Sequence, residues 1–395
     1  MGESWRARVA RVPDWAWLAG IVVASAALRV WLVRAMPAPF VFVDELIYSE
    51  LAKSVADAGS FAVRGVPTSG YSTLYPLLLA PAYALFDALP SAYALAKATN
   101  AVAMSFAAVP AWLVTRRVAG RGLSLLCAVI AVAIPSMAYT ATLVTETLFY
   151  PVALFFAWTF LRVLERPSGG RIAVLTAALV AAVATRSQAI GFVGAVVLAP
   201  FLLALLRRDP GVLRRFAPFL GGTIGLGLLV VVAQLARGRS LSDLLGAYSV
   251  VGEGGYDAGN VLRFWLWHVE ELTLYVAVVP VVALVVLLGQ ARELPARVQE
   301  HLAATLGLIA TSTLVVGAFA SRFASDRVQD RYLFFLAPLL VAVLAAWVEL
   351  GAPRPRVPLV VGAFVAVGLV VVFPYVRFIG EPAKSDTFGL LPLWT

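Results

Sequence analysis

Two adjacent carboxylates, Asp44 and Glu45, follow the first apolar run of the chain by only a few residues. From Asp44 to Ala58 apolar side chains recur at helical spacing, so we expect an amphipathic helix there. A carboxylate in the first turn caps a helix and is favoured by the helix dipole. A cap explains one acid but not two, and charged side chains at a hydrocarbon boundary are costly. We therefore interpret the pair as part of a functional site.

Glu146 is a third candidate acid, because it interrupts apolar sequence on both sides. One interpretation is structural: Thr145 caps a helix, and Glu146 occupies its first turn. The other is functional: the carboxylate faces the first loop, where it positions a substrate or binds a cation. Both interpretations stay open at this point, and we group Glu146 with Asp44 and Glu45 as catalytic candidates.

Arginine is the second residue type that suggests chemistry. Arg186 separates two short apolar runs, and Arg331 precedes another apolar run after a loop rich in arginine and aspartate. A guanidinium binds two phosphate oxygens at once, and anionic lipid headgroups lie at this depth in a membrane. The alternative is internal pairing, in which Asp326 and Asp330 neutralise Arg327 and Arg331. The candidate phosphate ligands are Arg186, Arg331, Arg327 and Arg322.

The remaining polar residues give weaker signals. His268 and Glu271 lie three residues apart in an apolar run, where they would line a polar cavity, but two side chains do not make a metal site. Lys97 would pair internally or reach a lipid phosphate. The chain has no phosphate-loop motif and no zinc signature, and we predict no metal site. Candidates for the substrate pocket are Tyr48, Lys53, Arg64, Tyr71, Tyr75, Lys97, His268, Glu271 and Tyr332.

The composition identifies the environment that must position these residues. Of the 395 residues, 61% are hydrophobic and 13% are charged, whereas soluble proteins average about 45–50% and about 25%. The mean hydropathy of +0.89 excludes a soluble enzyme, a nucleic-acid module and a disordered protein. The net charge of +9 comes from short arginine clusters between apolar runs, as in the cytoplasmic loops of membrane proteins. A single cysteine, Cys127, cannot form an intrachain disulfide.

Eleven apolar runs approach the length of about 20 residues that a membrane span needs. The first run has no small-residue cleavage site after it, so we interpret it as a transmembrane helix and not as a signal peptide. We predict an all-α polytopic membrane protein with about eleven transmembrane helices and a helical first outer loop. The predicted spans are Trp15–Met36, Ser91–Thr115, Leu123–Val144, Thr147–Leu161, Ile172–Ala184, Ala189–Leu206, Phe216–Ala236, Phe264–Gly289, His301–Ala320, Tyr332–Leu350 and Pro358–Phe378.

Arginine-rich loops alternate along the chain, which predicts that the N-terminus is cytoplasmic and the C-terminus is outside. The apolar stretch Thr73–Leu89 would break this alternation if it crossed, and it contains Pro76 and Pro81. We therefore expect an interfacial or re-entrant helix there. The first outer loop then covers residues 37–90 and carries the first two acids, within a single transmembrane domain of residues 1–395.

At these residues the sequence resembles the polyprenyl-phosphate-sugar-dependent glycosyltransferases of the GT-C fold. It is most similar to the branch that holds the protein O-mannosyltransferases and the lipid A aminoarabinose transferase. The likeness covers most of the chain in layout, but only short motifs in residues. These motifs are Val43-Asp44-Glu45-Leu46-Ile47-Tyr48, Gly70-Tyr71-Ser72-Thr73-Leu74-Tyr75-Pro76, Thr145-Glu146-Thr147-Leu148, Thr185-Arg186-Ser187-Gln188 and Asp330-Arg331-Tyr332-Leu333.

The resemblance implies an inverting glycosyltransferase of the plasma membrane that moves a hexosyl or pentosyl group on its extracytoplasmic side. The donor would be a polyprenyl-phosphate-linked sugar, and the acceptor a hydroxyl of a glycan, lipid or protein. Asp44 would be the base, Glu45 and Glu146 would orient the acceptor or a cation, and arginines would stabilise the departing phosphate. No cofactor is required, and a role for Mg²⁺ or Mn²⁺ stays open.

A transporter or flippase for a lipid-linked or anionic substrate is the competing interpretation. Transporters often show internal repeats and charges at mid-membrane. This sequence shows no repeat of fixed period, and its polar residues gather on one predicted face. A non-catalytic scaffold is the third class.

Overall fold

Long apolar helices form most of the structure, because a chain in lipid must satisfy its backbone hydrogen bonds within each segment. The computed structural model describes residues 11–39, 42–240, 251–252, 254–324, 326–380 and 386–393. Within these residues, six helical stretches are long and apolar enough to span a membrane. They are Asp14–Ala35, Leu89–Thr115, Glu146–Glu165, Ser187–Arg207, Gly211–Ala236 and Ala296–Phe323.

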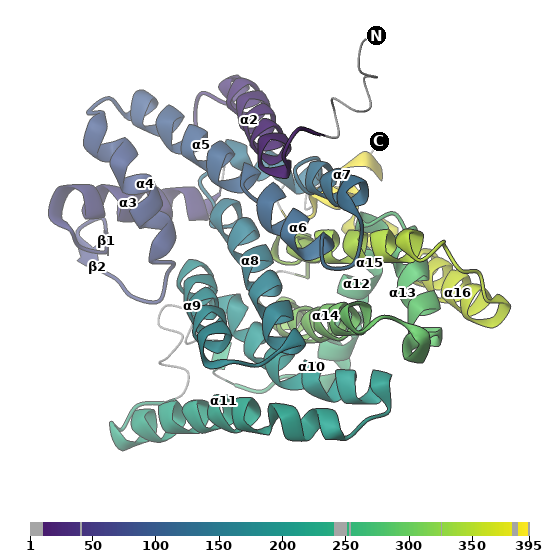
Figure 1. Ribbon diagram of the computed structural model, residues 1–395. Coiled ribbons are helices and arrows are strands. Elements are labelled where there is room, and N and C mark those ends of the chain that lie inside the picture. The colour runs from purple at the N-terminus through teal and green to yellow at the C-terminus, as the bar shows by residue number, and fades with distance from the viewer. Residues whose placement is uncertain are drawn as a thin grey trace, which may run out of the picture.

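These stretches and their neighbours follow the predicted spans in order (Figure 1). The helices in them are α2 (Asp14–Leu32), α5 (Leu89–Ser105), α6 (Ala108–Thr115), α8 (Glu146–Glu165), α10 (Gly191–Arg207), α11 (Gly211–Ala236) and α14 (Ala296–Phe323). Two bent pairs bring the number of candidate spans to eight: α7 (Arg121–Ala131) with η2 (Pro135–Ala141), and α12 (Ala258–Tyr275) with α13 (Val279–Gly289). The other three predicted spans coincide with shorter apolar helices: α9 (Gly169–Thr185), η7 with α15 (Phe334–Leu336 and Ala337–Glu349), and α16 (Arg356–Val372).

The predicted span Phe264–Gly289 is not one straight helix but a bent pair of helices. The chain turns by 107° between α12 and α13. Ala277 and Val278 have positive φ angles of 60° and 68° at this turn, and Pro280 follows in the first turn of α13. Proline cannot donate a backbone hydrogen bond and clashes with the preceding turn, so α12 cannot continue through it. Hydropathy does not register the break, because the residues on both sides are apolar.

The first outer loop is helical, as the sequence predicted. Helix α3 (Val43–Ala58) ends at Gly59, whose φ of 61° is the left-handed conformation that glycine adopts at helix ends. A short hairpin of β1 (Ala62–Val63) and β2 (Val66–Pro67) leads to α4 (Leu74–Leu85). At 1.5 Å per residue α4 is about 18 Å long, shorter than a hydrocarbon core of about 30 Å.

Helix α3 rests on α4 through a small aromatic core. Tyr48 and Leu51 of α3 pack against Tyr75 and Leu79 of α4, and the Tyr48 and Tyr75 rings meet edge to face at 5.3 Å. The loop before α4 is also tied to a distant helix, because the Thr73 amide donates to the carbonyl of Ala184 in α9 at 2.9 Å. The first outer loop is thereby fixed over the end of α9.

The main core lies where α8, α10, α14 and α15 meet. Phe149 and Phe156 of α8 stack on Phe192 of α10, with ring centroids 5.9 and 4.6 Å apart. Gly317 lets α14 approach α12 closely, because a Cβ at this position would lie 2.8 Å from the Trp265 amide nitrogen. This packing fixes the ends of α8, α9 and α14, which carry the loops that hold the candidate site.

Candidate active site

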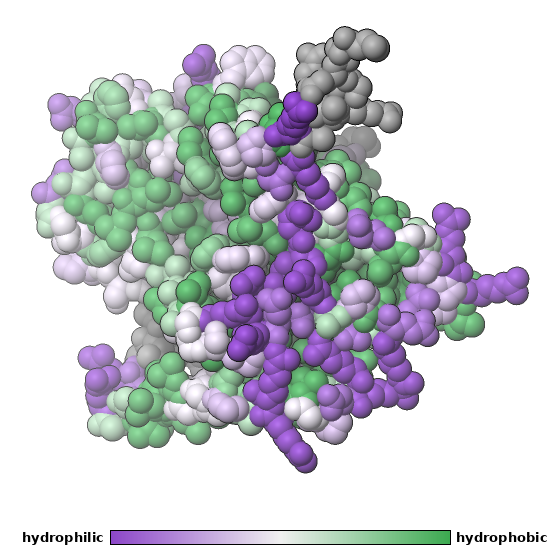
Figure 2. Space-filling model, in the orientation of Figure 1, coloured by the Kyte–Doolittle hydropathy of each residue, from purple (hydrophilic) through white to green (hydrophobic). Residues whose placement is uncertain are grey.

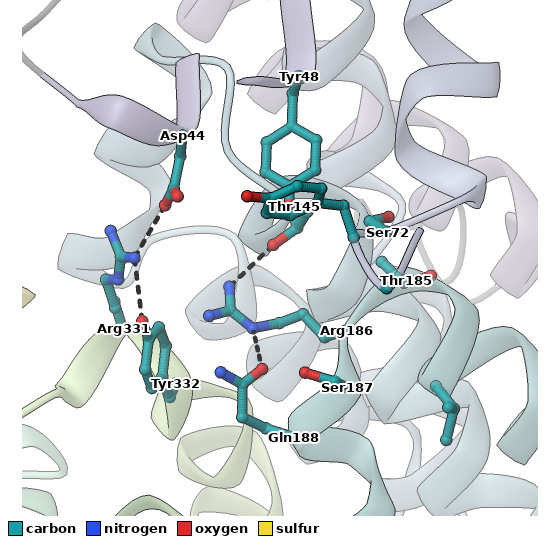
Figure 3. Close-up of a pocket in the computed structure, with 13 residues that line it drawn as sticks. Asp44, Tyr48, Ser72, Thr145, Thr185, Arg186, Ser187, Gln188, Arg331 and Tyr332 are labelled. Carbon is teal, nitrogen blue, oxygen red and sulfur yellow. Dashed lines mark hydrogen bonds and ion pairs between the residues drawn. The ribbon is translucent and has the colours of Figure 1, made fainter. Parts of the chain in front are cut away.

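Four charged residues from distant parts of the chain meet beneath the first outer loop. Figure 3 shows three of them, Asp44, Arg186 and Arg331. Asp44 lies in the first turn of α3, and Glu146 is the first residue of α8. Arg186 follows the last residue of α9, and Arg331 lies in the 3₁₀ turn η6 (Asp330–Tyr332). Helix ends and turns from four places in the chain therefore build one cluster of charges.

Arg186 is held from three directions. Its Nη1 lies 2.7 Å from Glu146 Oε2 and donates to Thr145 Oγ1 at 2.9 Å. Its Nε donates to Gln188 Oε1 at 3.1 Å, and its guanidinium lies 4.1 Å from the centre of the Tyr332 ring. The guanidinium is therefore fixed in orientation before any ligand arrives.

Arg331 connects the first outer loop to the buried acid. Its Nη2 donates to Asp44 Oδ2 at 2.9 Å and to the Tyr332 hydroxyl at 3.1 Å. Its Nε lies 3.2 Å from Glu146 Oε1 and 3.8 Å from Asp386 Oδ1. Asp386 lies 55 residues beyond Arg331, and nothing in the sequence indicated a role for it.

The two acids of the cluster differ in exposure. Glu146 is fully buried between the two guanidinium groups, whereas the side chain of Asp44 is 29% exposed. Buried charges are stable only when they are paired. Glu146 therefore fixes the arginines, and Asp44 is the carboxylate that a substrate can reach.

Both arginines stay cationic. Burial works to lower the pKa of Arg331, but the neighbouring Tyr332, Glu146 and Asp44 outweigh it and raise that pKa well above its ordinary value. The pKa of Arg186 is raised in the same way, since Glu146 outweighs the effect of burial. Two permanent positive charges thus face one cavity.

A polar cavity of about 40 Å³ lies between these groups, which is room for about three water molecules. Tyr48, Tyr71 and Tyr332, which the sequence proposed for the substrate pocket, line it. Ser72 and Gln188 line it as well, although the sequence indicated no specific role for either. The full lining is Asp44, Tyr48, Gly70, Tyr71, Ser72, Thr145, Val183, Thr185, Arg186, Ser187, Gln188, Arg331 and Tyr332.

Glu45 lies on another side of α3 from Asp44. Successive side chains on a helix are about 100° apart, and Glu45 Oε1 accepts from the Tyr93 hydroxyl and the Leu143 amide, both at 2.9 Å. It lines a second cavity, of about 430 Å³, together with Lys53. Glu45 therefore does not share the cavity of Asp44, although the sequence grouped the two acids.

The other residues proposed for the substrate pocket do not line the 40 Å³ cavity. Arg64 is exposed in the hairpin turn, and Lys97 donates to the carbonyls of Val33 and Met36. The hydroxyl of Tyr75 donates to Asn100 Oδ1 at 3.1 Å. These side chains support the first outer loop and its connection to α2.

His268 and Glu271 are buried in α12 and also lie outside the 40 Å³ cavity. His268 Nδ1 lies 2.6 Å from the Phe264 carbonyl, and Nε2 accepts from the Gln329 amide at 3.1 Å. Both ring nitrogens are occupied in a neutral tautomer, which is the pattern of a structural histidine. Among the described residues, no group of three or more His, Cys, Asp or Glu side chains is placed to hold a metal ion.

The internal pairing that the sequence suggested has different partners. Arg327 pairs with Asp386 at 3.0 Å, and Asp326 pairs with Arg377. Asp330 accepts from the Gly389 amide at 2.8 Å, and the acidic partners of Arg331 are Asp44, Glu146 and Asp386. The proposed pairing within the 322–331 loop was wrong, because the C-terminal segment folds back onto this loop. Arg322 stacks on Tyr256 at 4.8 Å, away from the cavity.

Comparison with known proteins identifies the architecture. No protein-family profile and no curated protein sequence matches the chain. The crystal structure of apo ArnT from Cupriavidus metallidurans superposes on 91% of the chain with a TM-score of 0.54 and 17% identity. The crystal structure of ArnT from Cupriavidus metallidurans bound to undecaprenyl phosphate superposes on 91% with a TM-score of 0.56 and 16% identity. The chain has the GT-C fold of ArnT.

The chain covers 64% and 70% of the lengths of these two ArnT chains. The GT-C fold is the one that the sequence motifs predicted, and it comes with several apolar helices of spanning length. The chain is therefore a multi-pass membrane protein whose charged cluster lies where helix ends meet the first outer loop.

Proposed function

We propose that the chain is an inverting glycosyltransferase that moves a sugar from a polyprenyl-phosphate donor to an acceptor hydroxyl. The observation that carries the proposal is the array of Asp44, Arg331, Glu146 and Arg186 around one cavity. The ArnT structure with undecaprenyl phosphate supports it, because that lipid phosphate binds to a protein of the same fold.

Arg186 and Arg331 would hold the donor phosphate. Each guanidinium has a fixed orientation and a raised pKa, so each offers a charged hydrogen-bond donor in a cavity that is largely closed to water. Such groups stabilise the negative charge that develops on a leaving phosphate. Their charge makes a divalent cation unnecessary in this proposal.

Asp44 would be the general base. The acceptor oxygen attacks the anomeric carbon, and its proton passes to the Asp44 carboxylate. The bond between the anomeric carbon and the phosphate oxygen breaks, and the polyprenyl phosphate leaves with the bonding electrons. A single displacement of this kind inverts the anomeric configuration.

Because Asp44 is paired with Arg331, the donor would have to bind before Asp44 can act as the base. While Arg331 Nη2 donates to Asp44 at 2.9 Å, the carboxylate is occupied and the cavity is too small for a sugar. A donor phosphate that replaces Asp44 on Arg331 would release the carboxylate to the acceptor. In this proposal donor binding precedes activation of the base.

The site would face the extracytoplasmic side of the plasma membrane, where sugars arrive on lipid phosphates. The acceptor would be a hydroxyl of a glycan, lipid or protein, and the transferred group a hexose or pentose. Glu146 would position the two arginines, while Tyr48, Tyr71 and Tyr332 would form the polar wall around the sugar.

The test is release of polyprenyl phosphate by the purified protein. The protein in detergent is given a panel of polyprenyl-phosphate-linked sugars and candidate acceptors, and free lipid phosphate is measured. We expect release that depends on an acceptor and disappears in the Asp44→Asn variant. A transporter moves the lipid-linked sugar intact and a scaffold leaves it unchanged, so intact donor across the whole panel contradicts the proposal.

A further inference from the structure

A third cavity, of about 350 Å³, lies at the opposite end of α8 from Glu146. It has no residue in common with the candidate active site. Two indoles, four guanidiniums and one carboxylate form most of its wall. Its lining is Trp112, Leu113, Arg116, Arg117, Trp158, Arg162, Glu165 and Arg297.

The length of α8 places this cavity relative to the membrane. Helix α8 has 20 residues, from Glu146 to Glu165. At 1.5 Å per residue it is about 30 Å long, which equals the thickness of a hydrocarbon core. If Glu146 lies at one membrane boundary, Glu165 and the cavity lie at the other. Figure 2 shows hydrophilic side chains that run from top to bottom through the middle of one face and spread toward its lower right, over the region of α6, α14 and the lower part of α8.

The charge around this cavity is unbalanced. Glu165 lies within 4 Å of the guanidiniums of Arg117, Arg162, Arg171 and Arg297. Glu300 pairs with Arg117 and Arg207. Five arginines therefore share two carboxylates, and Arg116, which lines the cavity, is a sixth cation of this cluster. The surplus is positive, and Arg116 and Arg297 are exposed at the rim.

Two donors in the wall have no partner among the described residues. They are the indole Nε1 of Trp112 and the Nε of Arg117, and both atoms are buried. A buried donor without an acceptor is destabilising. Both atoms are closed to solvent, so a ligand in the cavity would instead contact the exposed guanidiniums of Arg116 and Arg297, and the surplus of positive charge selects an anionic ligand.

We propose that this cavity binds the phosphate headgroup of an anionic phospholipid in the leaflet opposite the candidate active site. The arginines would contact the phosphate oxygens, and Trp112 and Trp158 would contact the glycerol and the first carbons of the acyl chains. Tryptophan prefers this interfacial depth, and basic side chains are attracted to anionic lipids there. Inorganic phosphate shares the charge but has no apolar part for the indoles, so the lipid is the better fit.

The experiment uses the full chain purified in detergent, with bound lipid counted by native mass spectrometry. The probes are phosphatidylglycerol, phosphatidylcholine and inorganic phosphate. The test variant is Arg116→Gln/Arg297→Gln, which removes two rim cations and leaves the buried Arg117 in place. The matched control is Arg354→Gln/Arg356→Gln, which removes two exposed arginines outside the cavity. Trp112→Phe removes the indole N–H and part of the ring surface but keeps an aromatic side chain.

We expect one phosphatidylglycerol to bind more tightly than phosphatidylcholine. In the rim variant its affinity should fall roughly tenfold to a hundredfold, while the control stays within about twofold of the parent. Trp112→Phe should weaken binding by a smaller factor. Equal affinity in the rim variant and the control, or no preference for phosphatidylglycerol, overturns the proposal. Inorganic phosphate that displaces phosphatidylglycerol at equal concentration also overturns it, and assigns the cavity to a free anion.

Discussion

Asp44 and Arg331 are 287 residues apart in sequence, yet they form a 2.9 Å ion pair across the candidate cavity. Glu146 connects the two arginines, because one of its carboxylate oxygens contacts Arg186 and the other contacts Arg331. Each guanidinium is thus neutralised by the protein itself. Any anionic substrate must compete with Asp44, the one exposed carboxylate of the set, and not with the buried Glu146.

Replacing Asp44 by asparagine separates catalysis from binding. We expect turnover to fall by about 10²–10⁴-fold, the usual contribution of a general base. Affinity for polyprenyl phosphate should stay equal or improve, because Arg331 loses a competing carboxylate. Glu45→Gln is the matched control, since Gln can still accept from Tyr93 and Leu143. Full activity in Asp44→Asn with release of polyprenyl phosphate would place the base elsewhere.

Lysine variants test whether the arginines bind phosphate, because they keep the positive charge and the protein should stay folded. Arg331→Lys retains the positive charge beside Glu146 but loses the planar guanidinium that can donate to two phosphate oxygens at once. We expect affinity for polyprenyl phosphate to fall by about 1.5–3 kcal/mol, roughly tenfold to a hundredfold, with a thermal unfolding temperature close to the parent. Arg327→Lys, on an arginine that pairs with Asp386 outside the cavity, should bind the lipid normally. Unchanged affinity in Arg331→Lys and in Arg186→Lys would remove the phosphate assignment.

The charges of Arg186 and Arg331 also predict whether turnover depends on a metal ion. If Arg186 and Arg331 carry the leaving-group charge, turnover in EDTA should equal turnover in Mg²⁺ or Mn²⁺ within about twofold. The measurement is the rate of polyprenyl phosphate release before and after chelation. Loss of activity in EDTA that added Mg²⁺ or Mn²⁺ restores would show that a cation takes part in the reaction, against the proposal.

The C-terminal segment packs against the turn that carries Arg331. Residues 386–393 pack beside η6, where Asp330 accepts from the Gly389 amide and Arg327 pairs with Asp386. Glu271 and Arg331 also face Asp330. A change in the charge of Asp330 therefore alters the contacts that hold η6 and Arg331 in place.

Burial raises the pKa of Asp330 to about 8, compared with about 3.9 in an unfolded chain. Because the folded state favours the neutral acid, this stabilisation is complete below about pH 4 and is lost as the pH rises through about 8. Asp330→Asn stays neutral and can still accept from Gly389, so its unfolding temperature should fall less than that of the parent as the pH rises. Parallel pH profiles of the two proteins, measured by thermal unfolding, would contradict the assignment.

Elements were more predictable than the directions of their side chains. The sequence located α3 because apolar spacing is a local property, and it located most spans because hydropathy sums over many residues. It could not show that Glu45 turns toward Tyr93, since this depends on which helix packs against α3. It also missed Asp386, whose partners come from a fold-back of the chain that no local pattern encodes.

At the scale of the whole molecule, ion pairs between loops define two faces. Arg117 pairs with Glu165 and Glu300, so the chain ends of α6, α8 and the start of α14 share one face. Arg121 with Asp14 adds the start of α2 to that face. Arg331 with Asp386 places a residue near the C-terminus on the other face, beside the candidate site. The eleven predicted spans, an odd number, place Asp14 and Asp386 on opposite sides of the membrane, and this stays a prediction.

Which face is cytoplasmic is the last prediction. Arginine-rich loops gather on the face of Arg117 and Glu165, so the positive-inside trend makes that face cytoplasmic and exposes the candidate site outside. Single cysteines at two exposed positions test this in a Cys127→Ala background: Arg64→Cys in the hairpin of the first outer loop, and Arg354→Cys before α16. With a membrane-impermeant maleimide on intact cells, we expect labelling at position 64 and none at 354. After lysis both should react, which controls for accessibility. Labelling of position 354 but not of position 64 in intact cells would mean that the predicted orientation is reversed. The candidate site would then lie in the cytoplasm, where a nucleotide sugar and not a lipid-linked sugar would be the natural donor.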